Sequence, residues 1–483
     1  MSGEEMARRL RRLAPERATW LVAALALFVA TGAAAVLLPT QLFLALLSGG
    51  LAVLAWLVWP DAVILGLLLI RSSIDGLLEV FTLFAGSPLS MTLSGVMNSL
   101  AVGLGLLTLA RRLLRQSERR SAALLVAAPG WTFALFLLAG LLSIPGSVDP
   151  AGGIKEWARL ASGLAIYLMV ADAVEGEKDA RRFVLVIMAS SLVPLAVALM
   201  QRLSGSGFFF LGYLGTEFAY RPRGTLFHPA TLGSYLVLLL TLAAALYFST
   251  PRPGERRPEA AGRPLAAGSW RVLLLGWAAT AGAVLTLTLA RTQWLGMVAS
   301  AMVLGLLKRL RLALLVLVLG LVLVWTVPLF RERLADPGST QWRLELWKGA
   351  SSLIWPPLTG GVRAALVGRG LATSPWHINQ VLPNVTSPPH DDYLKVAIEM
   401  GALGLLTYGA WLLATLRHAW RAYRRAELRS VAWRGLALLA IVIAGMVMSI
   451  SDNYLSYTAV QWYFWALVAL VPVDGRWPAR SPS

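Results

Sequence analysis

Residues 230–248 read ATLGSYLVLLLTLAAALYF and contain no charged side chain. An apolar stretch of about 20 residues is long enough to cross the ~30 Å hydrocarbon core of a bilayer as a helix. We identify fourteen such stretches, near residues 19–38, 41–59, 61–84, 93–110, 122–142, 157–173, 183–202, 230–248, 272–290, 293–307, 312–329, 393–416, 435–450 and 457–473. Because little more than Pro60 separates two of them, a count of twelve or thirteen is the alternative. The sequence predicts an all-α polytopic membrane protein with about 12–14 transmembrane helices.

The overall composition supports this class. Of the 483 residues, 57% are hydrophobic and 14% are charged, and the mean hydropathy is +0.67. Soluble domains carry about a quarter charged residues, so this chain has too few to cover a water-facing surface. The absence of cysteine excludes disulfides, thiolate metal sites and cysteine nucleophiles. With four histidines in the chain, a multi-histidine metal centre is not expected.

The basic residues that give the net charge of +18 are distributed unevenly. If the N-terminus is cytoplasmic, 29 of the 43 Lys and Arg residues fall in loops on the cytoplasmic side. These loops contain residues 8–17, 111–120, 178–182, 252–271, 308–311, 417–434 and 476–480. The positive-inside rule therefore accounts for the basic excess. Membrane lipids are the expected partner, and no nucleic acid is expected.

The same orientation places a long loop of about 60 residues on the external face, together with the loop at 203–229 and the turn at Arg291. Loops of this length are uncommon unless they are functional. We divide the chain into N-terminal transmembrane helices (1–220), helices that carry two external arginines (221–329), the long extracytoplasmic loop (330–392) and C-terminal transmembrane helices (393–483).

Two arginines lie on the external rim. Arg223 is in RPRGTLFHP at 221–229, and Arg291 is in LARTQWLG at 289–296. A guanidinium near hydrocarbon is retained where it has an anionic partner, and its planar fork matches phosphate oxygens. Snorkelling or a structural ion pair is the alternative for either arginine alone. Because two arginines share the rim with few carboxylates nearby in sequence, we favour anion binding.

The sequence SPPHDDYL at 387–394 ends the long loop and opens a helix. The prolines stop any preceding helix, and Asp391 or Asp392 can cap the new one. The free N–H groups of a helix N-terminus favour an anion or a developing negative charge. His390 stands beside them, and histidine suits proton transfer or a hydrogen bond to phosphate at neutral pH. The alternative is that the aspartates are only caps and His390 is a surface residue.

Other charged residues have a simpler interpretation. Arg71, Asp75 and Glu79 recur every four residues on one predicted helix and indicate an internal ion pair. Lys395 and Glu399 have the same spacing and predict a local salt bridge. No two histidines have a spacing typical of zinc ligands, so no metal site is predicted.

The run HDDYL at 390–394, followed by EMGALG at 399–404, resembles the signature of the O-antigen ligase and polymerase superfamily. In that family a loop histidine precedes a helix with a Glu-x-Gly-x-x-Gly pattern. The segments around Arg223 and Arg291 are similar to the family's two external arginine motifs, although Ala290 stands where serine is common. The run WRLELW at 342–347 resembles its arginine-plus-tryptophan helix and includes Arg343. The resemblance covers roughly residues 221–406.

This resemblance implies a GT-C-like membrane glycosyltransferase in the bacterial cytoplasmic (inner) membrane, with its active site on the external side. The donor would be a glycan on a polyprenyl diphosphate, and the acceptor a growing lipid-linked glycan or a lipid A core. Arg223 and Arg291 would hold the diphosphate, Arg343 would bind phosphate or support the loop, and His390 would assist catalysis. The family implies an inverting reaction without metal or other cofactor. For the base, Asp391, Asp392, Glu217 and His390 all stay candidates.

A transporter or flippase for a lipid-linked glycan is the alternative function. Many spans, charged residues within them and external arginines fit that class as well. However, transporters are commonly built from two repeated halves, and the sequence shows no internal repeat. A transporter also has no need of a 60-residue external loop. The glycosyltransferase interpretation is therefore preferred.

Overall fold

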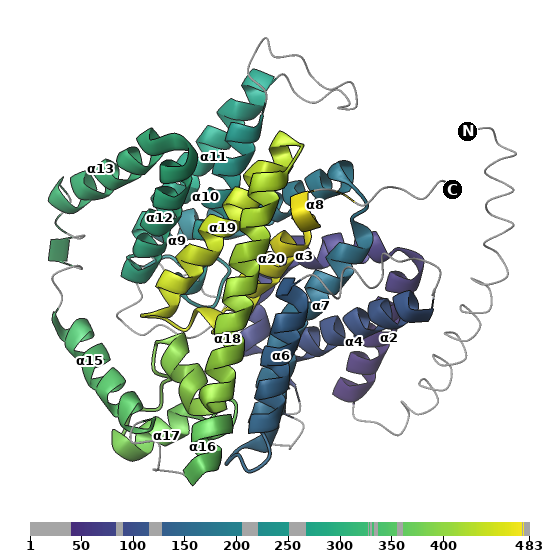
Figure 1. Ribbon diagram of the computed structural model, residues 1–483, viewed down its shortest axis with the longest axis vertical. Helices are drawn as coiled ribbons and strands as arrows, with labels where there is room; N and C mark the ends of the chain where they lie inside the picture. Colours follow the sequence, from purple (N-terminus) through teal and green to yellow (C-terminus); the bar gives the residue numbers. More distant parts are fainter. Residues whose placement is uncertain are drawn as a thin grey trace, which may run out of the picture.

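The computed structural model describes residues 40–83, 90–114, 128–204, 221–250, 267–326, 328, 331–332, 337–354, 361–475 and 477. The predicted span at 19–38, Glu217 and most of the linker at 249–271 lie outside these ranges. The described chain is helical except for one hairpin, in which β1 (Thr82–Leu83) pairs antiparallel with β2 (Met91–Thr92). The predicted all-α class is confirmed (Figure 1).

The helices have the following bounds. They are α2 (Thr40–Val58), α3 (Pro60–Val80), α4 (Leu93–Leu114), α6 (Ala128–Ser143), α7 (Pro150–Ala173), α8 (Glu177–Ala189), α9 (Leu192–Ser204), α10 (Pro229–Ser249), α11 (Ala267–Leu287), α12 (Arg291–Leu304), η3 (Gly305–Arg309), α13 (Leu310–Thr326), α15 (Pro337–Ser352), α16 (Gly361–Val367), α17 (Ser374–Val381), α18 (Asp392–Arg425), α19 (Arg429–Ser449), η4 (Tyr454–Ser456), α20 (Thr458–Ala469) and η5 (Val473–Gly475).

Six of the described helical segments are long and apolar enough to cross a membrane. They are α4, α8 with α9, α10, α11, α18 and α19, and shorter apolar helices occur within α2, α6 and α13. The protein is therefore an all-α, multi-pass membrane protein.

Two predicted segments differ in detail from the structure. The span at 183–202 is broken at Ser190 and Ser191, because Pro194 has no N–H to continue the helical ladder. The long loop at 330–392 is not irregular in its described part but contains α15, α16 and α17, which lie together at the lower end of Figure 1. Its polar composition hid these helices, since they lack a strong apolar periodicity.

The centre of the molecule is formed by α10, α19 and α20. In both α10 and α19, 78% of the most apolar 18-residue stretch is buried. These helices therefore pack mainly against protein rather than lipid. Aromatic side chains fill the neighbouring space, with the rings of Phe133, Trp411 and Trp465 in mutual contact at centroid distances of 4.6–5.5 Å. This rigid centre holds the helix ends at which the polar turns begin.

One end of the molecule gathers residues from the predicted basic loops. Arg434 pairs with Glu177 at 2.6 Å, Arg425 pairs with Asp474 at 3.0 Å, and Arg429 donates to the carbonyl of Phe248 at 2.8 Å. Helix α18 runs from the opposite end, where α15, α16 and α17 lie, to this one (Figure 1). Arg425, Arg429 and Arg434 thus lie at the end opposite the described part of the 330–392 segment (Figure 1).

The 330–392 segment crosses α18 at a break in that helix. Gly401 has φ +63° and Gly368 has φ +82°, and a Cβ on either would meet the backbone of the other segment at 2.3–2.7 Å. The N–H groups of Arg369 and Gly370 donate to the carbonyls of Ile398 and Glu399 at 2.9 and 3.1 Å. Gly401 and Gly368 therefore allow the two backbones to touch.

The predicted salt bridge between Lys395 and Glu399 is wrong. Lys395 Nζ instead donates to Glu156 Oε1 on α7 at 2.9 Å, and Glu399 Oε1 accepts from the N–H and hydroxyl of Ser374 at 3.2 and 2.6 Å. The i,i+4 spacing puts both side chains on one face of α18. Different neighbouring segments, however, lie over the two turns of that face and supply closer partners.

Candidate active site

His390 is held in a constrained turn before α18. Its φ is +51°, which is unusual for a residue other than glycine, and it follows two prolines. Asp391 is the N-cap of α18 and accepts from Leu394 N–H at 2.8 Å. On the other side, Trp347 of α15 donates its indole N–H to the carbonyl of Pro389 at 3.0 Å. The imidazole is thus placed by contacts on both sides of the turn.

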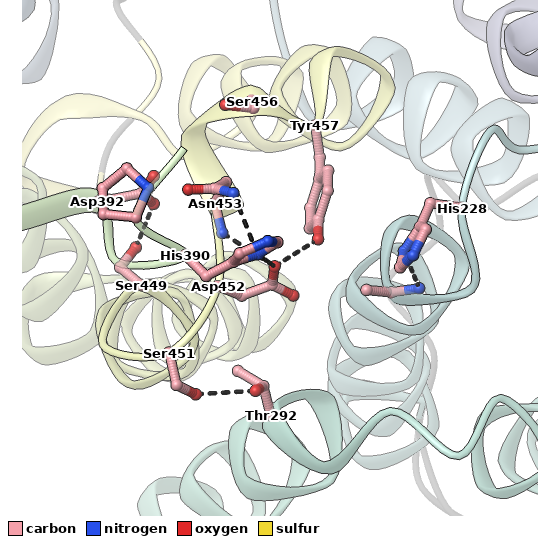
Figure 2. Close-up of polar contacts among 12 residues, drawn as sticks. His228, Thr292, His390, Asp392, Ser449, Ser451, Asp452, Asn453, Ser456 and Tyr457 are labelled. Atoms are coloured by element: carbon pink, nitrogen blue, oxygen red, sulfur yellow. Dashed lines mark hydrogen bonds and ion pairs between the residues drawn. The ribbon is translucent and has the colours of Figure 1, made fainter. Parts of the chain in front are cut away.

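The imidazole faces the turn between α19 and α20. His390 Nδ1 lies 3.2 Å from Asn453 Nδ2 and 3.8 Å from Asp452 Oδ1 (Figure 2). Asp452 is 6% exposed, and its carboxylate accepts from Tyr457 at 2.7 Å and from Gln293 at 2.7 Å. A histidine beside a buried, hydrogen-bonded carboxylate is an arrangement that supports proton transfer.

Asp452 is held in its ionised form. Burial by itself would raise the pKa of this carboxyl group, but the facing His390 and the hydrogen bonds from Tyr457 and Gln293 outweigh it and lower the pKa to about 2. The negative charge is therefore present at any working pH.

The start of α12 is joined to the same turn. Thr292 and Ser451 share a hydrogen bond of 2.8 Å between their hydroxyls, and Gln293 donates to Asp452. Arg291 is the first residue of α12, so its guanidinium stands at a helix N-terminus next to this turn. The geometry brings Arg291 and His390 to one place although 98 positions separate them in the sequence.

Helix α15 makes a second connection between these two residues. Arg291 Nη1 lies 3.5 Å from the hydroxyl of Thr340, and two positions later the ring of Trp342 meets the His390 ring at 5.5 Å. Arg343 follows on the same helix, and its positive charge acts on Tyr457, the hydrogen-bond partner of Asp452. The region around the 452–457 turn therefore brings together three of the predicted residues, Arg291, Arg343 and His390.

The segment with Arg223 is fixed by α3 and α9. Gln201 Oε1 accepts from the N–H groups of Arg223 and Gly224, both at 3.0 Å. Thr225 donates its hydroxyl to the carbonyl of Ser72 at 2.6 Å, and Asp75 accepts from Phe227 N–H at 3.3 Å.

The predicted ion pair on α3 supports this anchor. Arg71 and Asp75 form it at 3.0 Å, and Arg71 is completely buried. The charged stripe therefore positions the arginine loop.

His228 links this loop to the site. It is the N-cap of α10, where its Nδ1 accepts from Ala230 N–H at 3.1 Å, and it lies across from Tyr457 and Asp452 in Figure 2. Burial is the main reason that its pKa falls to about 4, and the nearby positive charges lower it further. His228 is therefore neutral at neutral pH and acts as a hydrogen-bonding group.

The two aspartates next to His390 have separate structural partners. Asp391 caps α18, and burial raises its pKa. Asp392 is completely buried, and its Oδ2 accepts from Ser449 at 2.8 Å and from Leu455 N–H at 2.9 Å. Both aspartates thus act as anchors for the turns around His390.

A largely buried cluster of three charged residues contacts the 454–456 turn. Glu156 pairs with Arg159 at 2.6 Å and with Lys395 at 2.9 Å. The same two cations donate to the turn, with Arg159 bound to the carbonyl of Leu455 at 2.8 Å and Lys395 to the hydroxyl of Ser456 at 3.2 Å. This network holds the 454–456 turn in place against α7 and α18.

Sequence reasoning missed Asp452, Asn453, Tyr457 and Gln293. The run SDNYLSY at 451–457 carries a usable signal, because it places several polar residues between two apolar spans on the predicted external side. Its partner could not be identified, since the contact with His390 spans about 60 residues. No group of three or more His, Asp or Glu side chains that could hold a metal ion gathers in the described ranges.

Residues 276–409 match the O-antigen ligase family. This region includes Arg291, α15, His390 and the crossing of α18 by the 330–392 segment. This match supports the predicted resemblance to the O-antigen ligase and polymerase superfamily. No curated protein matches the chain. Arg223 and Asp452 lie outside the matched residues, so their assignment to the site rests on geometry.

Proposed function

We propose that this protein is a membrane glycosyltransferase that moves a glycan from a polyprenyl diphosphate to a sugar hydroxyl at the external face of the bacterial inner membrane. One observation carries the proposal. The turn that holds His390 against the buried Asp452 is hydrogen-bonded to the start of α12, where Arg291 stands. A proton acceptor and a cation are thus joined to the same turn.

The proposed reaction is a single displacement. His390 takes the proton of the acceptor hydroxyl, whose oxygen forms a bond to the anomeric carbon of the donor sugar. The bond from that carbon to the diphosphate oxygen breaks, and its electron pair leaves with the diphosphate. Asp452 stabilises the imidazolium that forms. Because the acceptor attacks from the face opposite the leaving group, the configuration at the anomeric carbon inverts.

The leaving group gains negative charge, and arginines are suited to receive it. Arg291 at a helix N-terminus and Arg223 in its anchored loop supply permanent charge and bidentate donors, with Arg343 nearby on α15. These guanidiniums supply the charge that a divalent ion supplies in other transferases. We therefore expect glycan transfer to persist in EDTA.

The test is transfer by the purified full-length protein in lipid nanodiscs, with a glycan on polyprenyl diphosphate as donor. Replacing Arg291 by Ala should reduce kcat/KM by roughly 30- to 4,000-fold, because losing one partner of a desolvated charge pair costs about 2–5 kcal/mol. Lys should restore part of the rate, since it keeps the charge but lacks the fork. The exposed Arg331 provides the matched control, and Arg331→Ala should leave the rate unchanged.

The choice of acceptor separates the two activities of the family. A ladder of longer lipid-linked glycans would identify a polymerase, and a product on lipid A core would identify a ligase. An Arg291→Ala protein that is folded and transfers glycan at the wild-type rate would refute the proposed role of the arginine. Movement of the donor between leaflets without a new glycosidic bond would instead support transport.

A further inference from the structure

The side chain of Asn453 has an amide oxygen that lacks a hydrogen-bond partner within the described chain. Its Nδ2 lies 3.2 Å from His390 Nδ1, while its Oδ1 is buried and has no hydrogen-bond partner within the described chain. Asp392 Oδ1 is likewise buried without a partner among these residues. In Figure 2 the oxygen end of the Asn453 amide points away from His390, on the side where Asp392 lies. Two acceptors are therefore left unpaired around one amide.

Rotating this amide by 180° removes the conflict. The nitrogen and oxygen of an amide have nearly the same shape, so their assignment follows from the hydrogen-bond network. After the rotation, Asn453 Oδ1 faces His390 Nδ1 and accepts a hydrogen bond if that nitrogen carries a proton. The NH2 group then replaces a buried, unpaired oxygen on the side of Asp392. Buried polar groups in proteins are almost always paired, which favours this arrangement.

The charges around the imidazole favour the same proton position. Asp452 Oδ1 lies 3.8 Å from His390 Nδ1, and a carboxylate facing the lone pair of an unprotonated nitrogen would be repelled. The neighbouring elements also bring His228 from the start of α10, Arg291 from α12 and Arg343 from α15. His228 is hydrogen-bonded within its own cap through Nδ1. The carboxylate of Asp452 is thus the charge that faces Nδ1 directly.

We propose that Asn453 is a positioning residue that accepts a hydrogen bond from Nδ1–H of His390 and so keeps the basic lone pair on Nε2. This inference rests on the proposed function, in which His390 takes a proton from the acceptor hydroxyl. Nδ1 faces the 452–453 turn, so Nε2 is the ring nitrogen on the side away from that turn. Asn453 thereby selects the tautomer in which the open nitrogen is a base.

Two substitutions test this assignment by activity. Asn453→Asp keeps an acceptor opposite Nδ1–H, so it should retain transfer within about tenfold at its pH optimum. Its added negative charge stabilises the protonated imidazole, so the acidic limb of the pH–rate profile should move to higher pH. Asn453→Leu has a similar size but cannot accept, and it should lose roughly 100-fold or more, because general-base catalysis is typically worth ~10²–10⁴. The exposed Asn384→Asp provides a matched charge control and should not move the profile.

The tautomer can also be observed without any substrate. The chain has four histidines, so magic-angle-spinning spectra of the 15N-histidine-labelled protein in lipid contain few signals, and His390→Gln identifies the relevant one. At a pH where the ring is neutral, we expect Nδ1 protonated and Nε2 unprotonated in the wild-type protein and in Asn453→Asp. Asn453→Leu should give a mixture.

Two results would overturn the inference. One is a wild-type spectrum with Nε2 protonated and Nδ1 free. The other is a loss of transfer in Asn453→Asp as large as in Asn453→Leu, since an amide that donates to Nδ1 could not be replaced by a carboxylate. If the spectra show the expected tautomer but no acceptor is glycosylated, the proposed function fails while Asn453 still sets the tautomer.

Discussion

His390 and Leu289 both have φ +51°, although most side chains avoid this conformation. Such residues cost about 1–3 kcal/mol and persist where the surrounding structure enforces them. Leu289 comes two residues before α12 and His390 two residues before α18. The two turns that present Arg291 and His390 thus each contain one strained residue. Both turns are held from outside, by Ser451 and Asp452 in one case and by Trp347 in the other.

At the residue scale, Asp452→Asn tests the paired carboxylate. The amide is nearly isosteric but carries no charge, so it stabilises a protonated His390 less well. We expect kcat to fall by roughly 10²–10⁴ and the acidic limb of the pH–rate profile to move to lower pH. Transfer assays between pH 5 and 9 measure both effects. An unchanged rate together with an unchanged profile would remove Asp452 from the mechanism.

His228 predicts a pH dependence of stability. Its pKa in the folded protein is about 4, below the ordinary histidine value of about 6.5, so the unfolded chain binds more protons between these values. Stability should therefore fall as the pH drops from about 6.5 toward 4. In His228→Asn the amide can still cap α10 but does not titrate, so the fall in Tm should be smaller. Thermal melts at pH 7.5 and 5 compare the proteins, and equal falls would contradict this origin.

At the scale of elements, the crossing of α18 by the 366–370 segment explains Gly401. This glycine is part of the 399–404 pattern in the sequence, and in the structure it makes room for a second backbone. Glu399, at the same crossing, binds Ser374 at the start of α17. The helix thereby fixes the 330–392 segment, which carries His390 near its end.

Gly401→Ala tests this crossing. The new Cβ would lie 2.6 Å from Gly368 N and would occupy a backbone with φ +63°, so we expect a loss of roughly 1–3 kcal/mol in stability. Gly409 is in the same helix with no atom within 4 Å of an added Cβ. Gly409→Ala should therefore be neutral or stabilising by about 0.5–1 kcal/mol. Melting temperatures in one detergent compare the two variants, and an equal response would rule out the tight crossing.

At the scale of the whole molecule, the two ends of the helix bundle differ in charge and in content. The basic end holds ion pairs between Arg434 and Glu177 and between Arg425 and Asp474. The other end holds the candidate site and α15 to α17. Orientation in the membrane follows from this difference by the positive-inside rule, which predicts that the site faces outward.

Cysteine labelling checks the orientation without background, because the chain has no cysteine. Ser352 at the end of α15 and Ser269 near the start of α11 are both exposed. Ser352→Cys should react with an impermeant maleimide on spheroplasts, and Ser269→Cys should react only after the membrane is opened. The reverse pattern would place the site in the cytoplasm and contradict a reaction at the external leaflet.

Much of the fold and part of the site follow from local sequence. Apolar length is a property of single segments, and the bilayer imposes it directly, so the all-α membrane class was predictable. Arg223, Arg291 and His390 stood out for the same reason, since a polar residue at the edge of an apolar stretch is visible without knowledge of its partner. The three helices within 330–392 could not be predicted, because their sequences lack a strong apolar periodicity.

The partners of the polar residues were decided by the tertiary structure. Lys395 has a carboxylate four residues away but binds Glu156 on another helix, and His390 stands next to two aspartates but faces Asp452 and Asn453. A buried charge takes the partner that packing brings within about 3 Å, and packing joins segments that are far apart in sequence. The sequence by itself therefore marked Arg291 and His390 as candidates, and only the tertiary structure decided which residues they meet, because packing joins segments that are far apart in the chain.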